Sequence, residues 1–227
     1  MEYSTELLLQ MAYAAQRVNK GYVKQTRRYS EDQPTTFSNK ELIAFTVRDD
    51  SWLPEDFVPL KITDEDRAAK AAGDKHMRRY TMLAMGDLPQ FESDIFAAYS
   101  SDKMPIGRIG LIAYIPEFVD REIANKIYKQ RMKTEFADSA YLTQNITDGN
   151  EVEILKVIPL NNIDFGEPVY LHFGAVGKDL VCFSKKEMYA VGETYEMVGR
   201  IKGQDKERET GLPMTRMNYV KLRKTEM

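Results

Sequence analysis

The chain has 227 residues, a length that corresponds to one large domain or two small ones. Hydrophobic residues make up 43% and charged residues 30%, which argues against global disorder, a collagen-like fibre and a membrane bundle. The 32 lysines and arginines against 35 aspartates and glutamates give a net charge of −3, so attraction to phosphate must come from a local patch.

Cysteine and histidine content narrows the class of protein further. One cysteine and two histidines are too few for a disulfide framework or a Cys/His zinc site, and they indicate a reducing, cytoplasmic setting. The longest apolar run, residues 107–116, is too short to span a membrane. The N-terminus has no positive flank before its apolar stretch, so we expect no secretory signal.

Residues 3–138 have the hydrophobic spacing of helices. Ser4 and Thr5 can cap a first helix, whose apolar residues recur at steps of three and four until Gly21 offers a stop. Thr63 precedes three acids, and a capping side chain followed by an acidic first turn suits the helix dipole. A second helix is expected to begin at residue 38 or 39. Three more helices are expected over residues 64–85, 89–99 and 116–136.

After residue 138 the hydrophobic spacing changes to two. Turn signals such as Asp148-Gly149 separate the alternating segments 151–158, 168–173, 179–183, 194–202 and 215–222. Five short strands are too few for a sandwich and enough for a small closed barrel. We therefore predict an α+β protein with a mainly α-helical domain over 1–138 and a five-stranded β-barrel domain over 139–227, joined by a linker near 137–143.

Cations occupy strand positions in the expected barrel. Residues 178–227 hold 11 lysines and arginines against 8 acids, so this block is locally positive. Strands that carry cations side by side can follow a phosphate backbone, and flat rings on a polar strand face can stack on bases. The candidate nucleic-acid-binding residues are Tyr170, His172, Lys185, Lys186, Arg200, Lys202, Arg216 and Lys221. The alternative is an ordinary solvated strand face, with Tyr170 filling one end of the barrel.

A second basic segment follows the first helix. It has no acid, and tyrosines are interleaved with its cations, which are Arg17, Lys20, Lys24, Arg27 and Arg28. Such a segment suits contact with phosphate or docking onto an acidic partner. It equally suits an exposed helix end, because cations near a helix C-terminus favour the dipole.

Patterns typical of catalysis are missing from the sequence. Neither a G-x-x-x-x-G-K-[ST] loop nor a G-x-G-x-x-G loop occurs, so nucleotide hydrolysis and dinucleotide binding are not expected. Glu151, Glu153 and Lys156 suggest a metal nuclease, but they alternate along one strand and meet no upstream acid that we can name. Cys182 lies between apolar residues and is expected to be a buried, inert thiol. We predict a protein that is not an enzyme and uses no cofactor or metal.

The barrel segment carries a resemblance to a known group of proteins. The strings LVCFSKK (180–186), YAVGETYEMVGRIK (189–202) and PMTRMNYVK (213–221) resemble the closing strands of an OB-fold module found in tailed-phage replication and recombination proteins. Those proteins are similar to single-stranded-DNA-binding proteins. The resemblance extends only weakly into the helical part, and the chain ends KLRKTEM where well-known phage single-strand binders carry an acidic tail.

The resemblance implies an OB-fold barrel and non-catalytic binding of single-stranded DNA in genome replication or recombination. It also implies a location in the host cytoplasm, and a helical part that contacts replication or recombination proteins or a second copy of the chain. A second hypothesis is a protein–protein adaptor, or an inhibitor of a host factor, that uses the barrel without nucleic acid. The net charge of −6 over residues 1–177 and the size of the helical part favour the second hypothesis.

Overall fold

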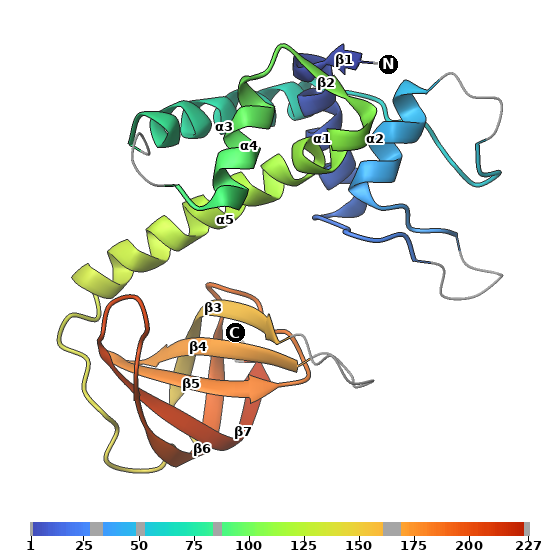
Figure 1. Cartoon of the computed structure of the whole chain (residues 1–227). Coiled ribbons are helices and arrows are strands. Elements are labelled where there is room, and N and C mark those ends of the chain that lie inside the picture. Colours follow the sequence, from blue (N-terminus) through green and yellow to red (C-terminus); the bar gives the residue numbers. More distant parts are fainter. Residues whose placement is uncertain (1, 28–33, 49–52, 84–87, 161–168, 225–227) are drawn as a thin grey trace. The chain divides into compact units, whose positions relative to one another are not determined.

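The computed structural model describes residues 2–27, 34–48, 53–83, 88–160 and 169–224 (Figure 1). Contacts divide the chain into two compact units, Met1–Ile123 (unit 1) and Ala124–Met227 (unit 2). The prediction of a helical part followed by a five-stranded sheet is confirmed. The units divide at residue 123, whereas the change of hydrophobic spacing by itself places a boundary after residue 138. The division at residue 123 falls inside the long helix of residues 109–134, so the end of that helix belongs to unit 2 with the sheet.

Unit 1 consists of helices around one hydrophobic core. Buried side chains from several helices form this core, among them Leu8, Ile43, Met77, Ile95 and Ile112. A short antiparallel pairing of β1 with β2 joins the start of the chain to the segment between α4 and α5. Its elements are β1 (Glu2–Ser4), α1 (Thr5–Asn19), α2 (Asn39–Val47), α3 (Asp64–Leu83), α4 (Gln90–Ser100), β2 (Lys103–Pro105), the 3-10 turn η1 (Ile106–Arg108) and α5 (Ile109–Thr134), which continues into unit 2.

Local capping explains where α2 and α3 begin. The Ser38 side chain accepts a hydrogen bond from the Glu41 backbone N–H, and the Glu41 carboxylate accepts one from the Ser38 N–H, so the two form a capping box. Thr63 and Asp66 make the same reciprocal pair at the start of α3. The predicted starts of both helices are therefore confirmed.

The start predicted for the last helix is wrong. α5 begins at Ile109, seven residues before the expected start, and Pro116 lies inside it. A proline here removes one N–H donor, which costs the helix a hydrogen bond. Ile109, Ile112 and Ile115 are buried completely or nearly so, and burial of three such side chains outweighs one lost bond. Tertiary packing therefore decides where this helix begins.

Unit 2 contains a closed barrel in which every strand has two neighbours. The strand order is β3-β4-β5-β7-β6, and β6 pairs with β3 to close the ring. β5 and β7 run parallel, while the other pairs are antiparallel. The strands are β3 (Glu151–Leu160), β4 (Val169–Val176), β5 (Asp179–Lys185), β6 (Thr194–Lys206) and β7 (Pro213–Lys224). Each contains or overlaps one of the five predicted segments.

The barrel strands carry two apolar layers. Val152, Ile154, Val181 and Met197 belong to one cluster, which fills the interior. Their chain neighbours point to the opposite face, because side chains alternate along a strand. Leu155, Ala175, Leu180, Cys182 and Met214 form a second cluster with Tyr128, Met132 and Phe136 at the end of α5 and just beyond it. The end of α5 therefore covers the outside of β3, β4 and β5 and the first residues of β7.

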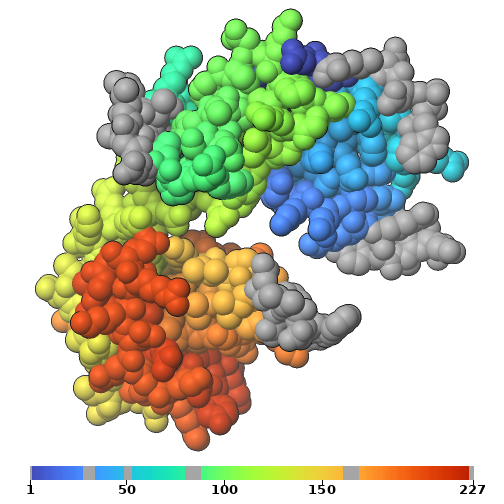
Figure 2. All heavy atoms as spheres, in the orientation of Figure 1, coloured from blue at the N-terminus to red at the C-terminus, as the bar shows by residue number. Residues whose placement is uncertain are grey.

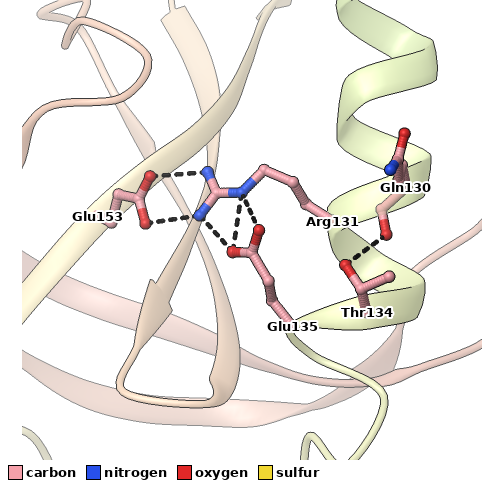
Figure 3. A network of polar contacts seen from close by, with 5 residues as sticks. All are labelled: Gln130, Arg131, Thr134, Glu135 and Glu153. Atoms are coloured by element: carbon pink, nitrogen blue, oxygen red, sulfur yellow. Dashed lines mark hydrogen bonds and ion pairs between the residues drawn. The ribbon is translucent and has the colours of Figure 1, made fainter.

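An ion-pair network ties α5 to β3 (Figure 3). The Arg131 guanidinium donates to both Glu153 carboxylate oxygens, at 2.7 and 2.9 Å, and also to the Glu135 carboxylate. These hydrogen bonds hold the pKa of Arg131 above its usual range. Lys129 of α5 pairs with Glu209 at 3.0 Å in the β6–β7 connection. Ion pairs therefore lie beside the apolar contact between the end of α5 and the barrel.

Candidate nucleic-acid interface

β6 and β7 form an antiparallel ribbon that carries a group of cations among its outward side chains. The register pairs Val198 with Lys221 and Arg200 with Asn218. Met197, Met217 and Val220 are buried in the interior cluster, so their chain neighbours face outward. Five exposed cations lie on this side, and we call them the β6–β7 basic face: Arg200, Lys202, Arg216, Lys221 and Arg223. Residues of both strands, orange to red, are visible on the surface of unit 2 (Figure 2).

Acids neutralise only part of the β6–β7 basic face. Asp205 lies 3.9 Å from Arg216, while the described part of the chain offers no ion pair to Lys202, Lys221 or Arg223. A hollow of about 280 Å³ is lined by Lys221 and Arg223 together with the acids Asp148 and Glu196. The Glu196 carboxylate accepts a hydrogen bond from the Gly149 N–H at 3.0 Å. The free cations therefore remain available to an anion from solvent.

Tyr219 is a candidate that the alternating pattern of its strand does not single out. Its side chain is 78% exposed, and its φ of +54° is in the left-handed region. The register between β6 and β7 shifts here, because Tyr219 is an extra residue in β7. The Arg200 guanidinium carbon lies 5.8 Å from the Tyr219 ring centroid, within the range of a cation–π contact.

A break in the hydrophobic spacing signals this bulge. Met217, Val220 and Leu222 all pack into the barrel interior, although the first two are three residues apart. Strict alternation from Met217 would have turned Tyr219 and Lys221 inward. The extra residue reverses that phase, and it places Lys221 and Arg223 on the outside.

The expected solvent-facing position of His172 is wrong. Its ring is fully buried and stacks on Phe183, with ring centroids 5.2 Å apart, and its Nε2 accepts a hydrogen bond from the Tyr189 N–H. Burial lowers the pKa of His172, so the ring is neutral at pH 7. Residues of β4 alternate as predicted, but the two faces of the strand are exchanged. Leu171 and Phe173 face outward and pack against the cluster at the end of α5, so His172 faces the barrel interior. Tyr170 is half-buried beside His172, with 6.4 Å between ring centroids.

The two predicted lysines at the end of β5 lie outside the β6–β7 basic face. Lys185 is half-buried, donates a hydrogen bond to the Val220 carbonyl at 3.2 Å and lies 3.7 Å from Glu187. Lys186 is exposed in the bend that follows β5. The structure therefore brings together four of the eight predicted site residues, Arg200, Lys202, Arg216 and Lys221.

The second basic segment belongs to unit 1, and its first cation has a structural role. Arg17 donates to both carboxylate oxygens of Asp66, at 2.8 and 3.0 Å, and to the Lys61 carbonyl. Lys20 is the exposed C-cap of α1, and Lys24 is also exposed. Arg27 is exposed and pairs through its backbone with Thr36, while Arg28 lies outside the described residues.

The contact between Arg17 and Asp66 makes the stability of unit 1 depend on pH. Burial alone would raise the pKa of Asp66, but hydrogen bonds from Arg17 and Thr63 hold it below its ordinary value of 3.8. Arg17→Gln is expected to lower the unfolding free energy by about 1–2 kcal/mol at pH 7. The difference between the two proteins should shrink as the pH falls through the lowered pKa, because protonated Asp66 no longer forms the ion pair.

Urea unfolding of both proteins at pH 7 and near pH 3 measures this difference. Lys24→Gln removes an exposed charge from the same segment, and it should leave the free energy of unfolding unchanged. A deficit for Arg17→Gln that stays constant across this pH range would contradict the role assigned to the ion pair.

Two of the three nuclease candidates, Glu153 and Lys156, are occupied by ion pairs. Glu153 binds Arg131, and Lys156 lies 3.4 Å from Glu209. Within the described residues, no three His, Cys, Asp or Glu side chains are grouped so that they could hold a metal ion. Cys182 is buried, and burial raises the pKa of its thiol to about 11, which keeps it protonated at neutral pH.

Over the ranges that the structure describes, no helix has both the length and the apolar character to cross a bilayer. No protein-family model matches the sequence, and no curated protein or solved structure shows significant similarity to the chain.

Proposed function

We propose that the chain binds single-stranded DNA, without catalysis, through the β6–β7 basic face of an OB-fold barrel, and that it acts in genome replication or recombination. The observation that carries the proposal is the placement of five exposed cations on one two-stranded ribbon beside an exposed tyrosine. A groove or face of this kind binds the phosphates of a flexible strand, while aromatic rings accept any base.

The strand connections support an OB-fold. β3, β4 and β5 form a meander, β6 returns to pair with β3, and β7 lies between β5 and β6. A five-stranded barrel with Greek-key connections is the defining architecture of this fold. The closed order and the parallel pairing of β5 with β7 are the features on which this assignment rests.

The position of α5 favours the β6–β7 basic face over the other side of the barrel. OB-folds commonly bind oligonucleotides on their second and third strands, which correspond here to β4 and β5. The outward residues Leu171, Phe173 and Cys182 on those strands pack against the cluster at the end of α5. The ribbon of β6 and β7 carries exposed cations instead, so a strand of DNA would bind there.

The proposal is tested by fluorescence anisotropy of a labelled oligothymidine titrated with the full chain at low and at moderate salt. We expect binding that weakens with salt, because cations displace counterions from phosphates. Unlabelled oligothymidine should compete, duplex DNA should compete poorly, and single-stranded RNA reports the preference for DNA. Absence of binding at low salt, where attraction between charges is least screened, would overturn the proposal in favour of a protein adaptor.

A further inference from the structure

The backbone at Tyr219 is in a conformation that its residue type disfavours. A left-handed φ brings the Cβ of an L-residue close to its own carbonyl oxygen, and glycine or asparagine usually occupies such a position. The bulge needs an extra residue to turn Val220 inward and Lys221 outward, but it does not need a tyrosine. Asn218, the neighbouring residue, is of a type that would adopt this φ at lower cost.

The ring of Tyr219 contributes little to the packing of unit 2. It is 78% exposed, the most exposed of the large hydrophobic side chains among the residues that the structure describes. Among the described residues its ring contacts Arg200, itself an exposed cation of the β6–β7 basic face. Strain and exposure at the same residue are typical of functional positions, because folding alone favours neither.

We propose that Tyr219 is the base-stacking residue of the β6–β7 basic face, so that the face binds unstacked nucleobases and thereby selects single strands over duplex. The inference rests on the proposed function. Arg200 contacts the ring, and Lys221 follows two residues later on the same outward side. A strand that places one base on Tyr219 therefore has cations nearby for its flanking phosphates. In a duplex the base faces are already stacked on each other, which leaves the ring without a ligand.

The test compares Tyr219→Gly and Tyr219→Phe with the unaltered full chain on two probes. One probe is a labelled oligothymidine, and the other is an abasic oligodeoxynucleotide with the same number of phosphates. Tyr219→Gly should bind oligothymidine about 5- to 150-fold more weakly, the range expected for one stacked base. It should bind the abasic probe as well as the unaltered chain does. Tyr219→Phe keeps the ring and should retain the affinity for oligothymidine.

Glycine also separates the loss of stacking from damage to the fold. Because glycine adopts the left-handed conformation without strain, the melting temperature of Tyr219→Gly should be unchanged or higher. Equal affinity of Tyr219→Gly and the unaltered chain for oligothymidine would overturn the stacking role and leave the proposed function intact. An equal loss of affinity of Tyr219→Gly for both probes would also overturn the stacking role and leave the proposed function intact. Failure of the unaltered chain to bind oligothymidine would overturn the proposed function itself, and the inference with it.

Discussion

Replacing Arg200 and Lys202 together by glutamine is expected to weaken the binding of the full chain to oligothymidine by roughly tenfold or more at low salt. Both side chains are exposed on the outward side of β6, where they can reach phosphates without first breaking a buried contact. Each phosphate contact releases counterions from a single strand. The slope of log K against log salt should therefore become shallower by about 1.4 when two contacts are lost.

A control with the same change in charge distinguishes this face from general electrostatic attraction. Lys133 and Lys178 are exposed cations of unit 2 that lie on neither β6 nor β7. The Lys133→Gln and Lys178→Gln double variant should keep most of the affinity and nearly the full salt slope. If both double variants lose affinity equally, the β6–β7 basic face has no special role. If neither loses any, DNA does not bind there.

Gly174→Ala is expected to destabilise the barrel by about 2–3 kcal/mol. A Cβ added to Gly174 would lie 2.6 Å from Val152 Cγ2 and 2.9 Å from the Glu153 carbonyl oxygen. Val152 is fully buried, and the carbonyl belongs to the neighbouring strand β3. Relief of the clash would require β3 and β4 to move apart, because neither contact is the free end of a flexible side chain.

Chemical denaturation followed by the far-UV circular dichroism of the full chain measures this effect. Gly203→Ala is the matched control on β6, where the added Cβ would meet only the Arg216 side chain at an ordinary 3.7 Å. Its free energy of unfolding should stay close to that of the unaltered chain. If Gly174→Ala unfolds at the same denaturant concentration as this control, β3 and β4 do not pack as closely as described.

Short-range patterns account for most of the secondary structure. Ser38 and Thr63 mark helix starts correctly because a capping side chain and its partner lie within three residues of each other. The five strands are visible as segments of period two. The same patterns also single out Arg200, Lys202 and Arg216, because these positions alternate with apolar residues that fill the barrel.

Long-range contacts explain where those patterns mislead. Pro116 does not mark the start of α5, since Ile112 and Ile115, which precede it on the same helix, are buried in the core of unit 1. His172 lies inside the barrel, because α5 covers the outward residues Leu171 and Phe173. When both faces of a strand make apolar contacts, the alternation of its residues does not show which face is toward the solvent.

Arg17 and Tyr219 show the same division between local pattern and tertiary contact. The sequence around Arg17 is basic, but only the fold brings in Asp66, 49 residues away, as its partner. The spacing of Met217 and Val220 is compatible with a bulge near Tyr219, but only the pairing with β6 shows the register shift there, and only the fold shows that the ring is exposed. Spacing and capping along the chain thus specify the elements and their order, because both act between near neighbours. Which faces are covered, which cations are free and which ring is exposed depend on contacts between distant segments, so only the folded structure decides them.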